Sequence, residues 1–276
     1  MDLTTYFSNI AQDEKHIWRL QNEIEEISYP SHGNEQCAQI EEVSFWFAHR
    51  TNVISSILKR FPPNGPLFDV GGGNGIVSLG LERAGFRSIV VEPGGDGVIC
   101  AKSRGLESVV HARFQDLQVI PGKVSAVGLF DVYEHIPPQE TFLREINHGM
   151  AENGKIYITV PAFQFLWSYE DVYAEHVRRY NTATLSSHLT SAGFKVLYSS
   201  YLFSYLLPPL LLFRTIPSLL SLRKEFSFEK AKSEHTAGSP VTRKVLNSLA
   251  QAESALISRG LSLPFGTSLL MVAQKS

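Results

Sequence analysis

The stretch Leu67–Gly75 reads LFDVGGGNG and places four glycines in the five positions 71–75, directly after a short apolar run. Glycine loses more conformational entropy on folding than any other residue, and a turn that only has to be tight needs one or two of them. Glycine also leaves the peptide N–H groups open to close approach, since it has no Cβ. We therefore interpret this loop as a backbone surface that cradles a ligand.

Short β-rich runs alternate with helical patterns from this loop onward. The expected strands are 67–70, 88–92, 108–111, 124–130 and 155–160. The helices expected between them are 76–85, 96–105 and 141–154, and each ends at or near a glycine. Such alternation is typical of βαβ units and predicts an α/β fold with a doubly wound, mostly parallel sheet. Ligands of such sheets bind at the carboxyl ends of the strands, where this loop would lie.

The remaining segments predict additions to this sheet. Residues 35–60 have apolar side chains near helical period, and after the fifth strand we expect a helix at 182–194 and a strand at 195–203. A polar connector at 224–240 precedes another helix, and the last strand would be 268–275. The predicted organisation is 1–60 for an N-terminal helical cap, 61–203 for the ligand-binding α/β domain, 204–260 for a helical insertion and 261–276 for the last strand.

The composition limits the class of protein. Of 276 residues, 43% are hydrophobic and 19% charged, which indicates a globular protein with a substantial core. A net charge of −2 and a pI near 6.5 lack the basic character of nucleic-acid-binding proteins, so we expect no nucleic-acid partner. Cys37 and Cys100 are far apart and predict reduced thiols. The first residues include no apolar run typical of a secretory signal, so we expect a cytoplasmic protein.

Residues 201–222 form the most apolar segment of the chain. Three prolines and Arg214 interrupt it, whereas a spanning helix needs about 20 predominantly apolar residues. This pattern does not favour a membrane span. It leaves open a buried helical lid, a peripheral membrane contact and a homodimer contact.

The glycine loop fits neither common phosphate-binding fingerprint. The dinucleotide pattern G-x-G-x-x-G counted from Gly71 requires glycine where Ile76 stands, and counted from Gly73 it reaches Ser78. A P-loop would need a lysine, and the loop has none. Asp69 instead precedes the glycines by two residues. Its carboxylate would repel a pyrophosphate and suits a ligand that carries ammonium or sulfonium charge.

A second carboxylate stands at the end of the next expected strand. Glu92 ends the run SIVVE, 17 residues after Gly75. An acid in this position can accept both hydroxyls of a ribose, as in proteins that bind adenosine-containing cofactors. The alternative is a surface glutamate before a turn, and the preceding loop favours the ribose role.

Four motifs in this order resemble one superfamily. LFDVGGGNG, VVEPG (90–94), RFQDL (113–117) and FDVYEHI (130–136) are similar to the ligand-contacting motifs of class I S-adenosylmethionine-dependent methyltransferases. The similarity extends over about residues 40–200, and the stretches 45–50 and 160–180 resemble a bacterial subgroup that methylates small molecules. The resemblance implies a Rossmann-like sheet of seven strands, S-adenosylmethionine as cofactor and a small-molecule substrate.

The resemblance also implies a role for individual residues. The loop residues that would surround the methionine part of the cofactor are Asp69, Gly71, Gly73 and Gly75. Glu92, followed by Pro93, would hold the ribose. The residues that would edge the adenine are Phe114, Gln115 and Asp116, and those beside the sulfonium and the carboxypropyl tail are Phe130 and Asp131. Ser125 stands where the superfamily commonly has an acid, and the resemblance assigns no function to residues 204–260.

His135 and His176 are the candidate catalytic residues. A general base is needed only where the nucleophile must lose a proton. His135 follows the fourth expected strand, and its alternative is packing at a helix start; His176 lies in the region expected to face the substrate, close to Arg178 and Arg179. Those arginines could bind a carboxylate or phosphate, or form an ion pair. The nine histidines are scattered without metal-ligand spacing, so the sequence predicts no metal site.

The aromatic side chains near the expected site give an indication of the substrate class. Phe45, Trp46, Phe163 and Trp167 are among those that could line an apolar pocket or seal the cap against the sheet. Together with 201–222 they leave open an apolar, lipid-linked, glycan or secondary-metabolite acceptor. Two other functions remain as alternatives: a non-catalytic binding or assembly protein, and an NAD-type oxidoreductase, which the glycine pattern disfavours.

Overall fold

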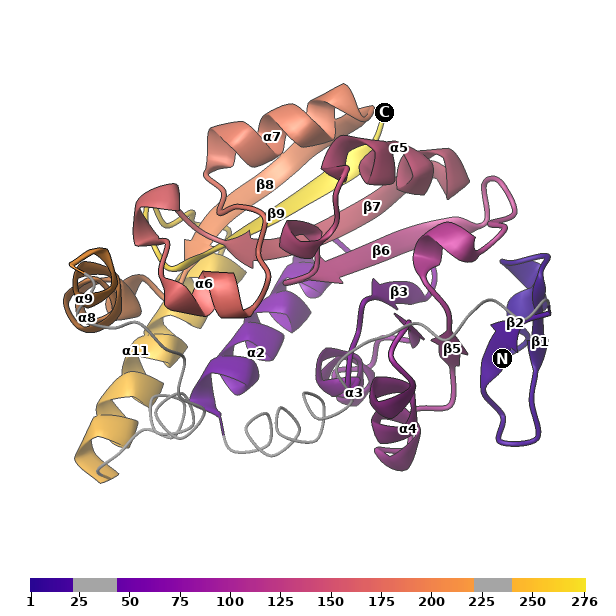
Figure 1. The fold of residues 1–276 in the computed structure, drawn as a ribbon, viewed down its shortest axis with the longest axis horizontal. Coiled ribbons are helices and arrows are strands. Elements are labelled where there is room, and N and C mark those ends of the chain that lie inside the picture. The colour runs from indigo at the N-terminus through magenta and orange to yellow at the C-terminus, as the bar shows by residue number, and fades with distance from the viewer. Residues whose placement is uncertain (22–43, 221–239) are drawn as a thin grey trace.

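The computed structural model describes residues 1–21, 44–220 and 240–276. They form a nine-stranded sheet in the order β1-β2-β5-β4-β3-β6-β7-β9-β8 (Figure 1). The strands are β1 (Ile10–Gln12), β2 (Trp18–Leu20), β3 (Leu67–Val70), β4 (Ser88–Glu92), β5 (Val109–His111), β6 (Val124–Phe130), β7 (Met150–Pro161), β8 (Phe194–Leu202) and β9 (Ser268–Lys275). The seven strands from β5 to β8 are those expected from the sequence, and they confirm the α/β class.

The strand directions bring the loops of interest to one edge of the sheet. Strands β3 to β7 run parallel, and β9 pairs antiparallel with both β7 and β8. Every residue of β3 and β4 is buried, as expected for strands covered on both faces. The loops that follow β3, β4, β5 and β6 therefore meet at the carboxyl edge.

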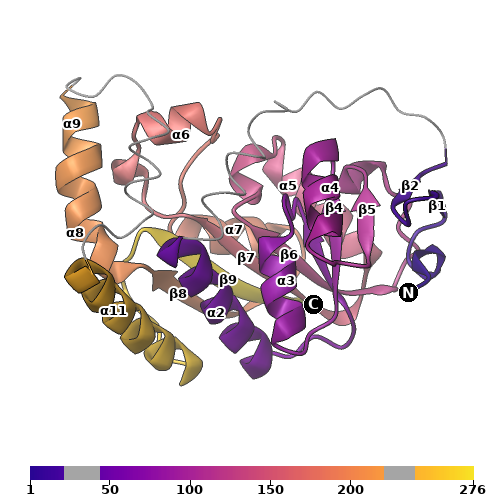
Figure 2. The same cartoon turned by 90° about the horizontal axis from the view of Figure 1, so that it is seen from below.

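Helices cover both faces of the sheet (Figures 1 and 2). The longer helices are α2 (Phe45–Arg60), α3 (Ile76–Arg83), α4 (Gly95–Ser103), α5 (Gln139–Gly149), α7 (Thr182–Ser191) and α11 (Pro240–Ser258). Helices α5 and α7 bury side chains such as Phe142 and Leu189 against one face. Helices α2, α3 and α11 pack on the other face, where Ile54, Leu81 and Ile257 share a core with β3 and β9.

The first 21 residues differ from the expected helical cap. They contain the two short strands β1 and β2, and β2 extends the sheet by pairing parallel with β5, with Trp18 opposite Val110. A helix of this length gains little stability in isolation. Pairing with the open edge of β5 satisfies backbone groups and buries Ile10 and Trp18. The helical prediction is confirmed only from Phe45, since 22–43 lie outside the described residues.

The predicted insertion begins as a helical segment whose hydrogen-bond pattern changes along its length. It comprises a turn at Ser204–Leu206, α8 (Leu207–Leu210), a π-helical turn (Leu211–Thr215) and α9 (Ile216–Leu219). Prolines occupy the first turns of α8 and α9, where no intrahelical N–H bond is lost. Most of the predicted connector 224–240 lies outside the described residues. Within the described part of the chain, no helix combines the length and apolar character needed to cross a membrane.

Glu253 of α11 holds three segments together. It is 3% exposed, and its Oε1 lies 2.8 Å from His49 Nε2 of α2. The same carboxylate accepts hydrogen bonds from the backbone N–H groups of Phe203 (2.7 Å) and Ser204 (2.9 Å). Burial raises the pKa of Glu253, but these hydrogen bonds outweigh burial and hold the pKa below its usual value. An ionised carboxylate thus joins α2, α11 and the end of β8.

Replacing Glu253 with alanine is expected to lower the free energy of unfolding by about 3 to 5 kcal/mol, because buried N–H donors lose their acceptor. Urea denaturation of the purified chain measures this change. Gln251→Ala, an exposed position on the same helix, is the matched control and should change stability by less than about 0.5 kcal/mol. Equal effects of the two substitutions would contradict the anchoring role of Glu253.

Candidate active site

The glycine loop after β3 is shaped by three left-handed residues. Gly71, Gly73 and Gly75 have φ values of +69°, +52° and +73°. A Cβ on Gly71 would lie 2.7 Å from Val132, and one on Gly75 would lie 2.4 Å from Leu106. A Cβ on Gly73 would meet nothing within 4 Å. Packing therefore requires the first and third glycines, whereas Gly73 borders open space that a ligand can occupy.

Asp69 lies under this loop as a buried carboxylate. It is 1% exposed, and its Oδ2 accepts a hydrogen bond of 2.7 Å from the Ser78 hydroxyl of α3. Burial raises the pKa of Asp69 from 3.8 to about 6, although Ser78 and the charge of Arg50 oppose that shift. A positively charged ligand near Asp69 would stabilise the ionised form.

Glu92 ends β4 and reaches across to the glycine loop. Its Oε2 accepts a hydrogen bond of 2.8 Å from the N–H of Gly73, and its Oε1 accepts one of 2.7 Å from Gly94. Burial raises the pKa of Glu92, and the two N–H donors partly offset that effect. Each carboxylate oxygen can accept a further hydrogen bond, so Glu92 can hold the loop and still bind a hydroxyl. The carbonyl oxygen of the neighbouring Pro93 lies 3.1 Å from Nε2 of His111.

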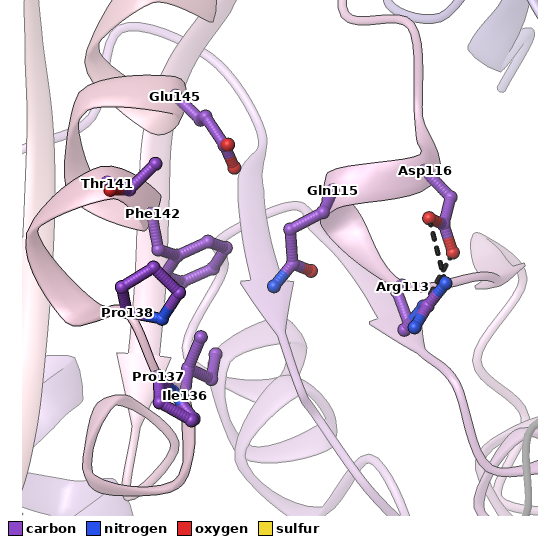
Figure 3. A pocket seen from close by; sticks show the side chains of 9 residues that line it. All are labelled: Arg113, Gln115, Asp116, Ile136, Pro137, Pro138, Thr141, Phe142 and Glu145. Carbon is purple, nitrogen blue, oxygen red and sulfur yellow. Dashed lines mark hydrogen bonds and ion pairs between the residues drawn. The ribbon is translucent and has the colours of Figure 1, made fainter.

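The turn after β5 (Phe114–Asp116) contains one core residue followed by two residues at the surface. Phe114 is buried and packs edge-on against Phe142, with ring centroids 6.2 Å apart. Asp116 accepts two hydrogen bonds from Arg113. Gln115 and Asp116 line a pocket of about 260 Å³ that the start of α5 closes on the other side (Figure 3). Of the three residues predicted at the adenine, these two are therefore accessible to a ligand.

Asp131 follows β6 in a left-handed conformation, with φ of +58°. Its Oδ1 accepts a hydrogen bond of 3.0 Å from the Thr159 hydroxyl, and its Oδ2 is paired with Arg50 of α2. The preceding Phe130 points into the core shared with α2 and is 6% exposed. Asp131 thus lies at the carboxyl edge, whereas Phe130 serves packing.

Arg50 was not singled out from the sequence, although it ends the stretch FWFAHR. It is 5% exposed, and its guanidinium carbon lies 4.6 Å from the Trp46 ring centroid and 5.1 Å from that of Phe47. Its positive charge also opposes the rise that burial causes in the pKa values of Asp69 and Glu134. Helix α2 therefore supplies a buried cation to a site composed mainly of acids.

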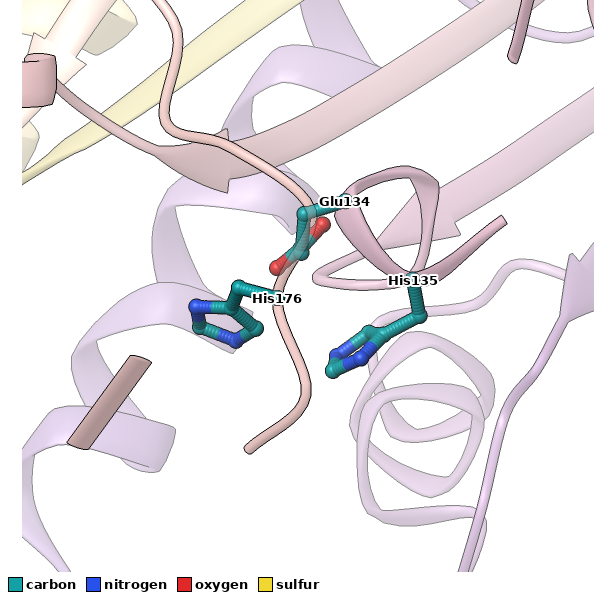
Figure 4. A group of neighbouring side chains, drawn as sticks. All are labelled: Glu134, His135 and His176. Carbon is teal, nitrogen blue, oxygen red and sulfur yellow. The ribbon is translucent and has the colours of Figure 1, made fainter. Parts of the chain in front are cut away.

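His135 and His176, which are 41 positions apart in the sequence, face each other in the structure (Figure 4). Their ring centroids are 4.8 Å apart. Burial, followed by the proximity of His176, lowers the pKa of His135 to about 4. The structure thus brings together the two histidines that the sequence analysis proposed separately.

Asp171 orients His176. Its Oδ1 lies 2.9 Å from His176 Nδ1 and accepts a 2.7 Å hydrogen bond from Arg179 Nε. Burial opposes ionisation of Asp171, but His176 and Arg179 hold its pKa down at about 2. The ionised carboxylate can only accept a hydrogen bond, so the Nδ1 of His176 carries the proton and its Nε2 is free in the neutral ring. Arg179 thus forms the ion pair that the sequence analysis had left as an alternative.

Glu134 lies between these groups and was not predicted. It is fully buried, and neither of its carboxylate oxygens has a hydrogen-bond partner in another described residue. Burial and the negative charge of Asp131 raise the pKa of Glu134 well above its usual range. No spacing in the sequence indicates this arrangement, because the three side chains come from two loops that only folding brings together.

The charges at this edge favour a cationic ligand. Asp69, Glu92, Asp131 and Glu134 gather around the glycine loop, and each of the last three interacts electrostatically with a neighbouring acid or with Arg50. S-adenosylmethionine carries both a sulfonium and an ammonium group, so its charge matches this site. The free space beside Gly73 is consistent with close approach of such a ligand. The fold and the site therefore define a class I methyltransferase.

The comparisons with known proteins agree with this class. The model of the methyltransferase domain family matches residues 46–199, and the chain belongs to that family. The protein is accordingly an S-adenosylmethionine-dependent methyltransferase with S-adenosylmethionine as its cofactor. The family match favours this activity over that of an NAD-type oxidoreductase. A comparison with curated proteins gave no significant match.

Solved structures with low sequence identity share the fold. A methyltransferase from Thermotoga maritima, described as a possible histamine N-methyltransferase, has a TM-score of 0.55 at 15% identity, covering 89% of this chain and 97% of that chain. Phosphoethanolamine N-methyltransferase 2 of Haemonchus contortus, in complex with S-adenosylmethionine, has a TM-score of 0.55 at 16% identity, covering 90% of this chain and 57% of that chain. A Haloferax volcanii protein bound to a methyltransferase activator has a TM-score of 0.55 at 15% identity, covering 88% of this chain and 96% of that chain.

Two glycine substitutions separate ligand contact from packing. Gly73→Ala is expected to lower the free energy of unfolding by about 1 to 2 kcal/mol, the cost of a left-handed alanine, and to weaken S-adenosylhomocysteine binding at least tenfold. Gly75→Ala should destabilise the chain more strongly, because its Cβ would overlap Leu106. Calorimetric titration and urea denaturation measure the two quantities. Full ligand affinity in Gly73→Ala would contradict the cradle.

Asp69→Asn is expected to stabilise the ligand-free chain at pH 7 while weakening cofactor binding. The folded pKa of about 6 lies above the usual 3.8, so the stability associated with the protonated carboxyl is lost as pH rises from about 4 to 6. Removing this penalty corresponds to at most about 3 kcal/mol. Denaturation at pH 4 and pH 7 measures it, and the exposed Asp96→Asn is the control. An equal effect at both pH values would contradict the assignment.

Proposed function

We propose that this methyltransferase acts on a small-molecule acceptor whose polar group lies against Glu134, His135 and His176. The observation that carries the proposal is the convergence of His176 with Glu134 and His135, which follow Asp131 at the carboxyl edge of the sheet. The chain lacks the basic character needed to hold a nucleic acid, with a net charge of −2. A small acceptor is consistent with both features.

We also propose which residues contact the cofactor, from the space, hydrogen bonds and burial around each of them. Asp69 and the loop glycines would surround the methionine part, with Gly73 closest because of the free space beside it. Each oxygen of Glu92 accepts one hydrogen bond from a backbone N–H and would accept a further one from a ribose hydroxyl. Gln115 and Asp116 would border the adenine, and Asp131 would lie beside the charged tail. Phe114 and Phe130 would act through packing, since both are buried in the core.

When bound, S-adenosylmethionine would supply the methyl group of its sulfonium to a nucleophile aligned opposite the carbon–sulfur bond, with S-adenosylhomocysteine as the leaving group. The chain contributes orientation and exclusion of water, and orientation alone can supply about 7–11 kcal/mol of the barrier. Where the nucleophile carries a proton, His176 is the better acceptor of the two histidines. Its free Nε2 is backed by the ionised Asp171, whereas the pKa of about 4 makes His135 a weak base.

An apolar part of the acceptor would find aromatic surface near this edge. Phe163 follows β7 and stacks on Tyr201, with ring centroids 4.6 Å apart, and on Phe165 at 5.2 Å. Three large apolar side chains are exposed here: Phe165 by 56%, and Phe213 and Leu212 of the helical segment after β8 by 70% and 59%. These side chains support an acceptor with an apolar portion. Membrane contact or homodimer formation through 201–222 stays a prediction.

The activity is tested by incubating the chain with S-adenosylmethionine and a panel of small hydroxyl- and amine-bearing compounds. Mass spectrometry would detect S-adenosylhomocysteine together with the methylated product. We expect turnover with at least one class of small acceptor and none with RNA or protein. S-adenosylhomocysteine binding without turnover on any acceptor would instead favour the non-catalytic binding or assembly protein.

His176→Gln is expected to lower kcat for the identified acceptor about 100-fold or more, the usual contribution of a positioned base. Arg179 still pairs with Asp171 in this variant, so the fold and the affinity for S-adenosylhomocysteine should be retained. Steady-state kinetics and calorimetric titration measure these quantities. His148→Gln, at an exposed position on α5, is the matched control and should behave as the unchanged chain. An undiminished kcat in His176→Gln would contradict its role.

A further inference from the structure

The cluster of Glu134, His135 and His176 has a composition that proton transfer alone does not explain. One ligand atom from each residue can be chosen so that all three lie within 4.8 Å of one another. The side chains converge from two separate loops (Figure 4). One buried carboxylate and two imidazoles form the donor set of known catalytic zinc sites.

We propose that Glu134, His135 and His176 form a binding site for a divalent first-row transition ion of the Zn²⁺ type. The first support is Glu134, which is fully buried, accepts no hydrogen bond from another described residue and lies beside the two rings. Buried carboxylates are normally paired or hydrogen-bonded. A cation at this point would provide the missing partner.

The second support is the orientation of both imidazoles. Asp171 lies 2.9 Å from the Nδ1 of His176 and so leaves its Nε2 available. The His135 ring interacts with the backbone carbonyls of Ala174 and Glu175. Histidines that bind metals commonly donate their other N–H to a carboxylate or a carbonyl, which fixes the tautomer and the ring. Asp171 is such a partner for His176, and the carbonyls of Ala174 and Glu175 lie beside the ring of His135.

The distances are compatible with closure around an ion. Ligands about 2.1 Å from a tetrahedral ion are about 3.4 Å apart, so a pair of atoms 4.8 Å apart must approach by about 1.4 Å. Rotation of the side chains about their own bonds can provide such a movement. Two nitrogen donors favour Zn²⁺ and similar ions over Mg²⁺ or Ca²⁺, which prefer oxygen ligands.

The charge balance also favours a cation. Asp131 is close enough to Glu134 to raise the pKa of that carboxyl, while Arg50 and Arg179 act in the opposite direction. Both arginines are already engaged, Arg50 with Asp131 and Arg179 with Asp171. Three protein ligands leave at least one position on the ion for water or another oxygen. The ion would occupy the Nε2 of His176, so ion and proton would compete for that atom.

The test uses the full chain, freed of metal by dialysis against a chelator, and Zn²⁺ alone as the probe. Calorimetric titration is expected to show one ion per chain with a Kd in the micromolar range or below. Glu134→Gln and His135→Gln should each weaken binding at least tenfold, with folding checked by circular dichroism. His148→Gln is the matched histidine control and should bind as the unchanged chain does.

Co²⁺ provides a second readout that a purely structural effect of the substitutions would not produce. We expect visible absorption bands typical of nitrogen ligation in the unchanged chain, and their loss in His135→Gln. Absence of stoichiometric Zn²⁺ binding, or undiminished binding in both variants, would overturn the site. Tighter binding of Mg²⁺ than of Zn²⁺ would overturn the class of ion. Neither titration needs donor or acceptor, so the outcome is independent of the proposed methyl transfer.

Discussion

The gathering of buried carboxylates at the carboxyl edge of the parallel sheet is the constraint on which the site depends. Asp69, Glu92 and Glu134 are each at most 5% exposed, and burial raises the pKa of all three. Ionised carboxylates removed from water must find N–H donors or positive charge. The N–H groups of Gly73 and Gly94 meet this requirement for Glu92, and the Ser78 hydroxyl and the charge of Arg50 favour ionisation of Asp69. Glu134 has no such donor in another described residue.

Helix α2 connects this edge with the C-terminal part of the chain. Its consecutive residues His49 and Arg50 make different contacts: His49 meets Glu253 of α11, and Arg50 meets Asp131 after β6. Glu253 in turn binds the backbone at the end of β8, where the helical segment 204–219 begins. A rotation of α2 would disturb both contacts at once. Helix α2 thus joins the segments after β8 to the site, and Ser218 also accepts a hydrogen bond from the N–H of Tyr169, close to Asp171.

The elements predicted correctly are those with a local apolar pattern in the sequence, and those missed depend on contacts with distant segments. Strands β3, β4 and β6 occupy the residues expected, because each is a mainly apolar run bounded by glycine, proline or charged residues. The N-terminal strands β1 and β2 were missed, since a three-residue strand carries no periodicity and exists only because β5 offers an open edge. Arg50 and Glu134 were missed as well. Both lie within stretches that the sequence analysis quoted, but their burial depends on distant segments.

The amino-acid sequence by itself determined the α/β class, the position of the glycine loop, the two acidic positions Asp69 and Glu92 and the family to which the chain belongs. These features depend on local patterns: apolar runs, glycines in a loop, and a carboxylate at a strand end. Only the tertiary structure decided that Glu134, His135 and His176 face one another and that Asp171 orients one ring. Side chains from two loops become neighbours through packing of β6, β7 and the segment that follows, and no spacing along the chain encodes that distance.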